Sequence, residues 1–170
     1  MIFWHLGLTL FLFIWIFRDK NADLRYLLVG SLLPDIIDKT LYLFLLTNNS
    51  RTYGHTLLFA VFSLFAIMIL TSRDNPKRKS YLLVPIALLF HLVLDEMWMF
   101  SETLFWPSFS GKFSAPSSSA DTLLELFIIS INKTEVIVKE ITGMLFFFVS
   151  INQNMSFRTN LVNLIKTGKY

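Results

Sequence analysis

Several histidine and aspartate residues lie inside apolar segments of the chain, where an ionisable side chain is costly. His91 and Asp95 are four residues apart within the apolar run 81–100, so a helix there would present an imidazole and a carboxylate on one face. Another apolar run carries Asp35 and Asp38. Ionisable residues in segments apolar enough for a bilayer usually face the protein interior and serve a function. Imidazole and carboxylate ligands together suit zinc, manganese or iron, so these residues predict a metal site.

The composition is typical of a protein embedded in a lipid bilayer. Hydrophobic residues make up 54% of the 170 residues and charged residues 16%, whereas soluble domains have about 45–50% apolar residues, glycine included, and about 25% charged residues. The 18 phenylalanines and 4 tryptophans suit a lipid-facing surface with aromatic side chains near its borders. The chain has no cysteine, so a metal must be bound by nitrogen and oxygen atoms. The small net charge of +3, with basic residues in short loops, indicates membrane topology rather than nucleic-acid binding.

Five segments are predicted to cross the membrane as helices. They are residues 2–17, 26–46, 55–71, 81–100 and about 135–151. Pro34 interrupts the second segment and predicts a kink there. Leu123–Ile131 is apolar but too short to span, so it either lies at the membrane interface or re-enters the membrane. The predicted fold is all-α: a polytopic membrane helical bundle of about five transmembrane helices in a single domain, residues 1–151, followed by a basic cytoplasmic tail, residues 152–170.

Lysine and arginine residues fall mainly in alternate loops. With five spans, the loops 18–25 and 72–80 and the tail lie on one side, whereas the loop 47–54 on the other side carries only Arg51. The positive-inside rule then places the tail in the cytoplasm and the N-terminus outside. In this orientation, ionisable residues from all five helices fall in the outer half of the membrane and predict one site. They are His5, Asp38, His55, His91, Asp95 and Glu140.

Four short motifs occur in an order that resembles a known family. Residues 30–39 read GSLLPDIIDK and resemble an LPD-x-D motif, and residues 51–58 read RTYGHTLL and resemble HRG-x-THSLL. His91–Asp95 resembles HxxxD, and residues 104–107, LFWP, resemble LWP. Over about residues 1–115 the chain is therefore similar to the YdjM-like family of membrane-bound metal-dependent hydrolases of bacteria and archaea.

His5 also fits the N-terminal histidine of that family, but the chain departs from the family pattern at two places. Ser50 stands where a histidine often precedes the arginine. Asp38 follows the first aspartate by three positions and is itself followed by Lys39, where the family often has an Asp-His pair spaced by one residue. Because both departures remove histidines, they favour one metal ion over two.

The resemblance implies a hydrolase that uses a divalent metal ion, with zinc favoured over manganese or iron. A more distant similarity to zinc-dependent phospholipase C and P1-type nucleases implies phosphoester chemistry. We therefore expect a metal-activated water to attack a phosphoester, such as a lipid or lipid-linked headgroup, with Asp38 or Glu140 as general base. Arg51, at the outer mouth, either pairs with the phosphate or anchors a lipid headgroup. The expected metal ligands are His5, Asp35, Asp38, His55, His91 and Asp95.

Two functions of other kinds use the same residues. A transporter for a divalent metal or a proton would need polar groups through the inner half of the membrane as well. Lys39 and Asp35 are the deepest such groups, since the inner parts of the first, third and fourth segments are almost wholly apolar. A non-catalytic membrane scaffold would use the polar centre to specify helix packing. Bound metal that is lost in His91→Ala and Asp95→Ala without unfolding would exclude the scaffold.

Overall fold

The computed structural model describes residues 1–19, 21–44, 46–47, 49–109, 111–115, 122–152 and 157–169, and these residues form helices and loops without a strand. The predicted all-helical fold is therefore confirmed. The elements of the described chain are α1 (Ile2–Phe17), α2 (Leu24–Leu43), the 3-10 helix η1 (Tyr53–His55), α3 (Leu57–Leu70), α4 (Arg78–Tyr81), α5 (Leu83–Leu94), the 3-10 helix η2 (Met97–Phe100), α6 (Ser101–Leu104), α7 (Leu123–Ile131), α8 (Thr134–Ile151) and α9 (Phe157–Thr167).

Polar residues at helix ends explain where two of the long helices begin. The Asp23 side chain accepts a hydrogen bond from the backbone N–H of Arg25 and so caps the start of α2. The Thr56 hydroxyl accepts from the backbone N–H of Phe59 at 3.0 Å and caps α3 in the same way. Pro34 lies inside α2 without ending it, although a proline removes one backbone donor from the helix.

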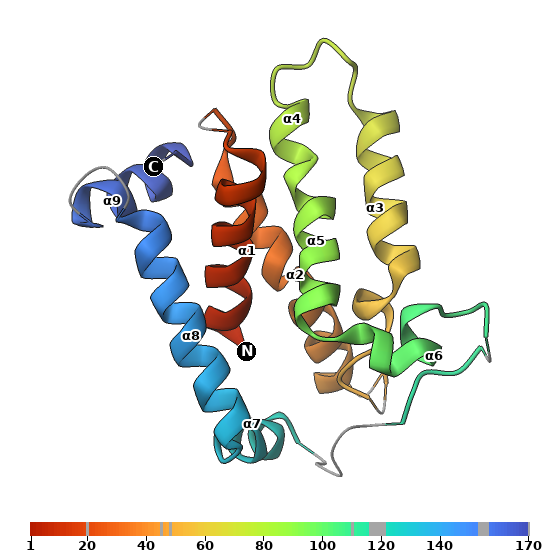
Figure 1. Ribbon diagram of the computed structural model, residues 1–170. Coiled ribbons are helices and arrows are strands. Elements are labelled where there is room, and N and C mark those ends of the chain that lie inside the picture. Colours follow the sequence, from red (N-terminus) through yellow and green to blue (C-terminus); the bar gives the residue numbers. More distant parts are fainter. Residues whose placement is uncertain are drawn as a thin grey trace.

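The helices α1, α2 and α5 form the centre of the bundle, with α8 along one side and α3 along the other (Figure 1). Helix α1 packs along α8 and against α2, α2 packs on α5, and α3 covers the other side of α5. The contact between α1 and α8 depends on Gly7 and Gly143, because a Cβ atom at either position would overlap the main chain of the opposite helix. This packing brings the start of α1, the second half of α2 and the end of α5 to the same end of the bundle.

The C-terminal helix α9 is packed against the opposite end of the bundle. Leu164 of α9 is 2% exposed and belongs to the same apolar core as Ile151 at the end of α8. The Asn160 side-chain amide donates to the carbonyl of Ile151 at 2.5 Å, and the Arg25 guanidinium donates to the carbonyl of Lys166 at 3.0 Å. Residues 157–167 of the predicted tail therefore form a docked helix.

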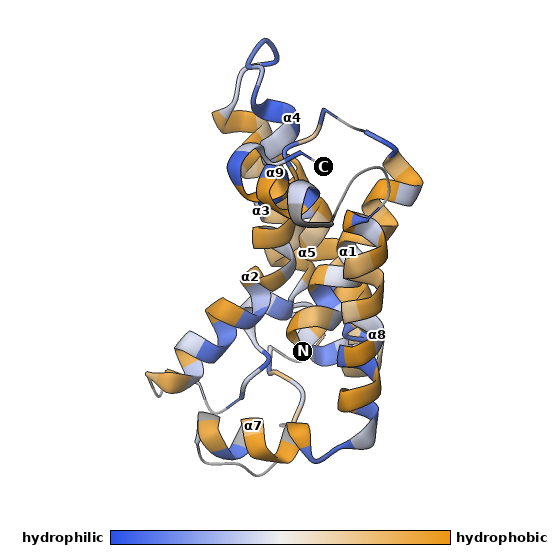
Figure 2. Cartoon of the chain, turned by 90° about the vertical axis from the view of Figure 1, so that its left-hand side faces the viewer, coloured by the Kyte–Doolittle hydropathy of each residue, from blue (hydrophilic) through white to orange (hydrophobic). Residues whose placement is uncertain are grey.

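The helices of the bundle consist largely of hydrophobic residues (Figure 2). Large apolar side chains stand exposed on α3 and α8, as with Ile69 (81%) and Leu145 (61%). Among the described residues, no helix taken singly has both the length and the apolar composition needed to cross a bilayer, whereas Arg78–Leu94 together with Met97–Leu104 meets both conditions as a pair bent by 81°. Helix α1 has 16 residues, or about 24 Å, against a hydrocarbon core of about 30 Å.

The predicted span 81–100 does not run as one helix. Helix α5 ends at Leu94, and after a break the chain continues into η2 and α6 at the 81° bend. Glu96 lies at this break with a left-handed φ of 54°, a conformation that ends helices. His91 and Asp95 remain joined through the last helical hydrogen bond, from Asp95 N to His91 O at 2.9 Å, so their common face is retained.

Candidate metal centre

Five ionisable side chains converge at the end of the bundle where α1 begins. Helix α1 supplies His5, α2 supplies Asp35, η1 supplies His55, and the end of α5 supplies His91 and Asp95. Each of the three histidines is no more than 1% exposed. Two overlapping groups have ligand atoms that all lie within 4.8 Å of one another, one of them His5, His91 and Asp95 and the other Asp35, His55 and His91. The structure thus brings together five of the six residues expected to bind metal.

The sixth, Asp38, lies behind His55 and holds its ring. Its Oδ2 atom lies 2.7 Å from Nδ1 of His55. The same carboxylate accepts hydrogen bonds from the backbone N–H of Thr52 at 2.5 Å, the Thr52 hydroxyl at 3.0 Å and the backbone N–H of Gly54 at 2.8 Å. Because a carboxylate accepts hydrogen bonds, the Nδ1 atom of His55 donates to it and keeps its proton, and the Nε2 atom of the neutral ring then carries a lone pair.

His91 is fixed by a main-chain carbonyl in the equivalent way. Its Nδ1 atom lies 2.7 Å from the carbonyl oxygen of Ser31. A carbonyl oxygen accepts and never donates, so Nδ1 carries the proton, and Nε2 of the neutral ring carries the lone pair. This nitrogen lies 3.2 Å from Nε2 of His55. The Nδ1 contacts with Asp38 and with the Ser31 carbonyl therefore turn the two Nε2 lone pairs toward each other.

Two nitrogen lone pairs that face each other repel unless a proton or a metal ion lies between them. Two histidine ligands of a tetrahedral zinc ion, each at about 2.0–2.1 Å, have nitrogens about 3.3 Å apart. The 3.2 Å separation of the Nε2 atoms of His55 and His91 agrees with that value. The two rings could therefore serve together as ligands of a divalent metal ion.

His5 and Asp95 add two further donors. The His5 ring stacks on His91 with centroids 4.0 Å apart, and its Nε2 lies 3.1 Å from Oδ1 of Asp95. Oδ1 of Asp95 is buried and has no hydrogen-bond partner with acceptable geometry among the described residues. A buried carboxylate oxygen without a donor is costly. A metal ion bound nearby would give this oxygen the partner that it lacks.

Asp35 lies at the more open side of the cluster. Its Oδ1 is 3.7 Å from Nε2 of His55, which is farther than the 3.2 Å between the Nε2 atoms of His55 and His91. Its Oδ2 accepts from the Lys39 ammonium at 2.8 Å and lies 3.8 Å from the amino group of Met1. The Asp35 side chain is 15% exposed, so this carboxylate borders the surface.

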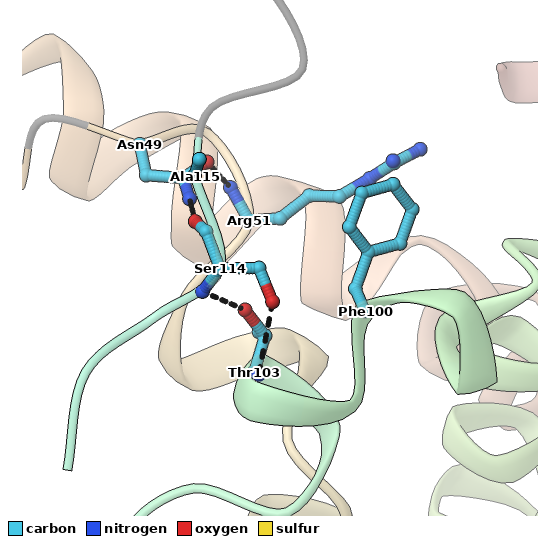
Figure 3. A pocket seen from close by; sticks show the side chains of 6 residues that line it. All are labelled: Asn49, Arg51, Phe100, Thr103, Ser114 and Ala115. Carbon is cyan, nitrogen blue, oxygen red and sulfur yellow. Dashed lines mark hydrogen bonds between the residues drawn. The ribbon is translucent and has the colours of Figure 1, made fainter. Parts of the chain in front are cut away.

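Arg51 lies at the rim of the cluster. Its Nη2 atom lies 2.9 Å from Oδ2 of Asp95, and the guanidinium carbon lies 5.3 Å from the centre of the Phe100 ring. The Arg51 side chain is 28% exposed. It also borders a small pocket (Figure 3), in which the Arg51 side chain runs beside Phe100 and away from Ser114 and Thr103. The guanidinium is therefore held in place and still reachable from outside.

Glu140 does not join the cluster. Its two carboxylate oxygens accept hydrogen bonds from the backbone N–H groups of Ile2 and Phe3 at 2.6 and 2.7 Å. Met1, the residue before α1, provides no side-chain cap. Glu140 of α8 therefore caps α1 from a neighbouring helix, whereas the sequence suggested a general base.

Three groups at the site were not anticipated from the sequence. The Ser31 carbonyl is a main-chain group and carries no sequence signal. Thr52 and Gly54 present their backbone N–H groups to Asp38. For Gly54 the sequence does offer a signal, because a glycine stands directly before His55. The structure gives its reason: a Cβ atom at this position would lie 2.7 Å from the Pro34 carbonyl oxygen.

Comparison with known proteins assigns the chain to a family. Residues 2–160 match the family model described as YdjM inner membrane protein. The chain belongs to the YdjM inner membrane protein family. No significant match was found among curated proteins or solved structures. The region shared with the family contains every residue of the candidate metal centre, so the chain combines membership of an inner membrane family with a buried group of histidines and aspartates that could hold a metal ion.

Proposed function

We propose that the chain is a metal-dependent hydrolase of the inner membrane that cleaves a phosphoester of a lipid or another amphipathic molecule. In this proposal a divalent ion, zinc being preferred, is bound by His5, His55, His91 and Asp95. The observation that carries the proposal is the 3.2 Å approach of the Nε2 atoms of His55 and His91, each with its other nitrogen fixed on an acceptor.

The donor set suits catalysis by a metal ion better than a permanently closed structural site. Histidine nitrogens and one carboxylate are typical ligands of catalytic zinc. Bound in such a set, a zinc ion supplies Lewis acidity and makes water a nucleophile near neutral pH. The side chains of Asp35 and Arg51 border the cluster and reach the surface, which supports access for a substrate.

The proposed roles of the other residues follow from their contacts. Asp35 accepts the proton of the attacking water at Oδ1, because it is the carboxylate with partial exposure. Arg51 donates hydrogen bonds to the phosphate while Asp95 and Phe100 hold its position. Asp38 acts through His55 as a positioning residue. Glu140 does the same through the first turn of α1.

We further propose that the chain crosses the membrane several times, with the N-terminus outside, the C-terminus in the cytoplasm and the metal centre in the outer half. The exposed apolar side chains of α3 and α8 support contact with lipid. Helix α7 lies crosswise at the end of α8 (Figures 1 and 2) and exposes Leu124 and Phe127, which favours a position at the membrane interface over re-entry. The basic residues of the loop 72–80 lie at the other end of the bundle.

Metal analysis of the detergent-purified protein, followed by assays with phospholipids and soluble phosphodiesters, tests this function. We expect a bound divalent ion and hydrolysis that both disappear in His91→Ala and Asp95→Ala, while Asp74→Ala, at an exposed position, retains both. Folding is checked by size-exclusion chromatography in detergent. Bound metal without hydrolysis, together with metal uptake into proteoliposomes, would instead establish a transporter. A correctly folded protein that binds no divalent metal would refute the proposal.

A further inference from the structure

Two carboxylates of the candidate centre, those of Asp95 and Asp35, each pair with a basic side chain. Asp95 turns Oδ1 toward His5, at 3.1 Å from its Nε2, and turns Oδ2 toward Arg51, at 2.9 Å from Nη2. Its Oδ2 also lies 3.6 Å from Nε2 of His55. One oxygen thus belongs to the histidine cluster, and the other is shared between the cluster and a guanidinium.

Asp35 makes a similar pair of contacts. Its Oδ1 lies 3.7 Å from Nε2 of His55, while its Oδ2 accepts from the Lys39 ammonium at 2.8 Å. Lys39 follows Asp35 by one helical turn on α2, so the helix itself sets this pairing. The Lys39 side chain is 46% exposed.

In hydrolases with two metal ions, about 3.5–4 Å apart, the ions together clamp the attacking and leaving oxygens. A carboxylate that bridges two ions would have to offer its second oxygen to the second one. Here the second oxygens of Asp95 and Asp35 are taken by Arg51 and Lys39. Both cations keep unused donors, because a guanidinium has five N–H groups and an ammonium has three.

We propose that the centre binds a single divalent ion and that Arg51 and Lys39 act as the two further positive charges that receive the substrate. This inference rests on the proposed function and names its ligand as a phosphate group. The histidines are at most 1% exposed, whereas Lys39 is 46% and Arg51 28% exposed. The phosphate therefore enters from the side where these cations lie. Without them, the charges of the two carboxylates would repel an anion.

Metal stoichiometry separates this arrangement from a two-ion site. Wild-type protein titrated with zinc and analysed by elemental analysis is expected to hold one ion per chain, and excess zinc is expected to add no second tightly bound ion. Lys39→Met and Arg51→Met should also hold one ion. Two tightly bound ions per wild-type chain would overturn this inference alone, whereas absence of any bound ion would overturn the metal centre of the proposed function as well.

Binding of inorganic phosphate to the zinc-loaded protein, followed by calorimetry, tests the role of the cations without turnover. Lys39→Met and Arg51→Met are each expected to weaken phosphate binding about tenfold or more, the usual effect of losing a hydrogen bond to a charged group. Lys39→Arg and Arg51→Lys keep the charge and should lose less. Lys77→Met, which removes an exposed lysine from the basic loop at the other end, is the matched control and should bind as wild type does. Unchanged affinity in both methionine variants would refute the proposal.

A short-chain phosphatidic acid serves as the second ligand, because its phosphate carries apolar chains. The same two variants should weaken its binding by a similar factor. Wild-type affinities for this lipid and for inorganic phosphate are compared. Tighter binding of the lipid would indicate a lipid headgroup as the natural ligand, and similar affinities would indicate a soluble phosphoester. Binding of this lipid that is insensitive to both variants would refute the role of the cations.

Discussion

The carboxylate of Asp38 lies 2.7 Å from Nδ1 of His55, on the side of the ring opposite to the nitrogen that faces His91. Four donors from His55, Thr52 and Gly54 converge on its two oxygens. The segment that carries His55 is therefore folded around the Asp38 carboxylate of α2. This arrangement fixes the direction of the ring and favours the neutral tautomer whose Nε2 carries the lone pair.

Asp38→Asn is expected to lower metal affinity by about 10- to 100-fold, the usual cost of removing such a partner of a ligand histidine. An amide nitrogen cannot accept, so two of the four donors lose their acceptor. The affinity is measured by competition with a chelator of known zinc affinity. Asp74→Asn, at an exposed position, is the matched control. A wild-type affinity in Asp38→Asn would show that Asp38 does not position His55.

Glu140→Gln is expected to destabilise the start of α1, because a neutral amide can accept only through its oxygen. The loss should be about 1–3 kcal/mol of unfolding free energy, as for other hydrogen bonds to a charged group, and metal affinity should fall as well, since His5 lies one turn further along α1. Thermal unfolding in detergent and metal competition measure the two effects.

The control for Glu140 lies on the same helix. Glu135 is 73% exposed and pairs with Lys139, so Glu135→Gln should change stability much less than Glu140→Gln does. If the two variants behaved alike in both measurements, a cap supplied by Glu140 would be excluded.

Part of this site follows from sequence periodicity. The i, i+4 spacing of His91 and Asp95 predicted a shared face, and the structure retains it at the end of α5. The positions of His5 and His55 near the ends of apolar runs predicted that they lie at one level of the bundle, and the structure brings both next to His91. These relationships depend on helix geometry, and helix geometry can be inferred from the spacing of residues in the sequence.

The distinction between Asp35 and Asp38 could not be predicted in this way. Both lie on α2, and their roles differ because η1 folds over Asp38 and gives it the N–H groups of Thr52 and Gly54. The role of Glu140 depends on contact between α1 and α8, which are more than a hundred residues apart. The break after Asp95 depends on a left-handed conformation at Glu96, a residue type that does not signal one.

Gly143→Ala is expected to destabilise the protein and to weaken metal binding. A Cβ atom at Gly143 would overlap the main chain at Phe3, so α1 and α8 would have to separate, and His5 would move with α1. Overpacking of this kind typically costs about 1–3 kcal/mol. Met144→Ala alters the next residue of α8, which is 51% exposed, and should have a smaller effect. Equal unfolding temperatures for Gly143→Ala and wild type would refute a close α1–α8 contact.

The ion pair between Asp19 and Lys79 should stabilise the protein only above acidic pH. The ammonium of Lys79 holds the pKa of the Asp19 carboxyl below its usual value. Since the folded-state pKa is lower than the unfolded one of about 3.9, the contribution is complete well above that value and is lost as pH falls through the folded-state pKa. Lys79 is 69% exposed, so the contribution should stay below about 1 kcal/mol.

A double-mutant cycle of Asp19→Asn and Lys79→Met, followed by unfolding in detergent at several pH values, isolates this pair from the acid sensitivity of the histidine cluster. The coupling energy should be positive at neutral pH, decrease as the solution is made more acidic than about pH 4, and decrease at high salt because the pair is exposed. A coupling energy that stays constant from neutral to strongly acidic pH would mean that the Asp19 carboxyl is not the titrating group. A coupling of zero throughout would mean that the contact between the loop after α1 and α4 gains nothing from this pair.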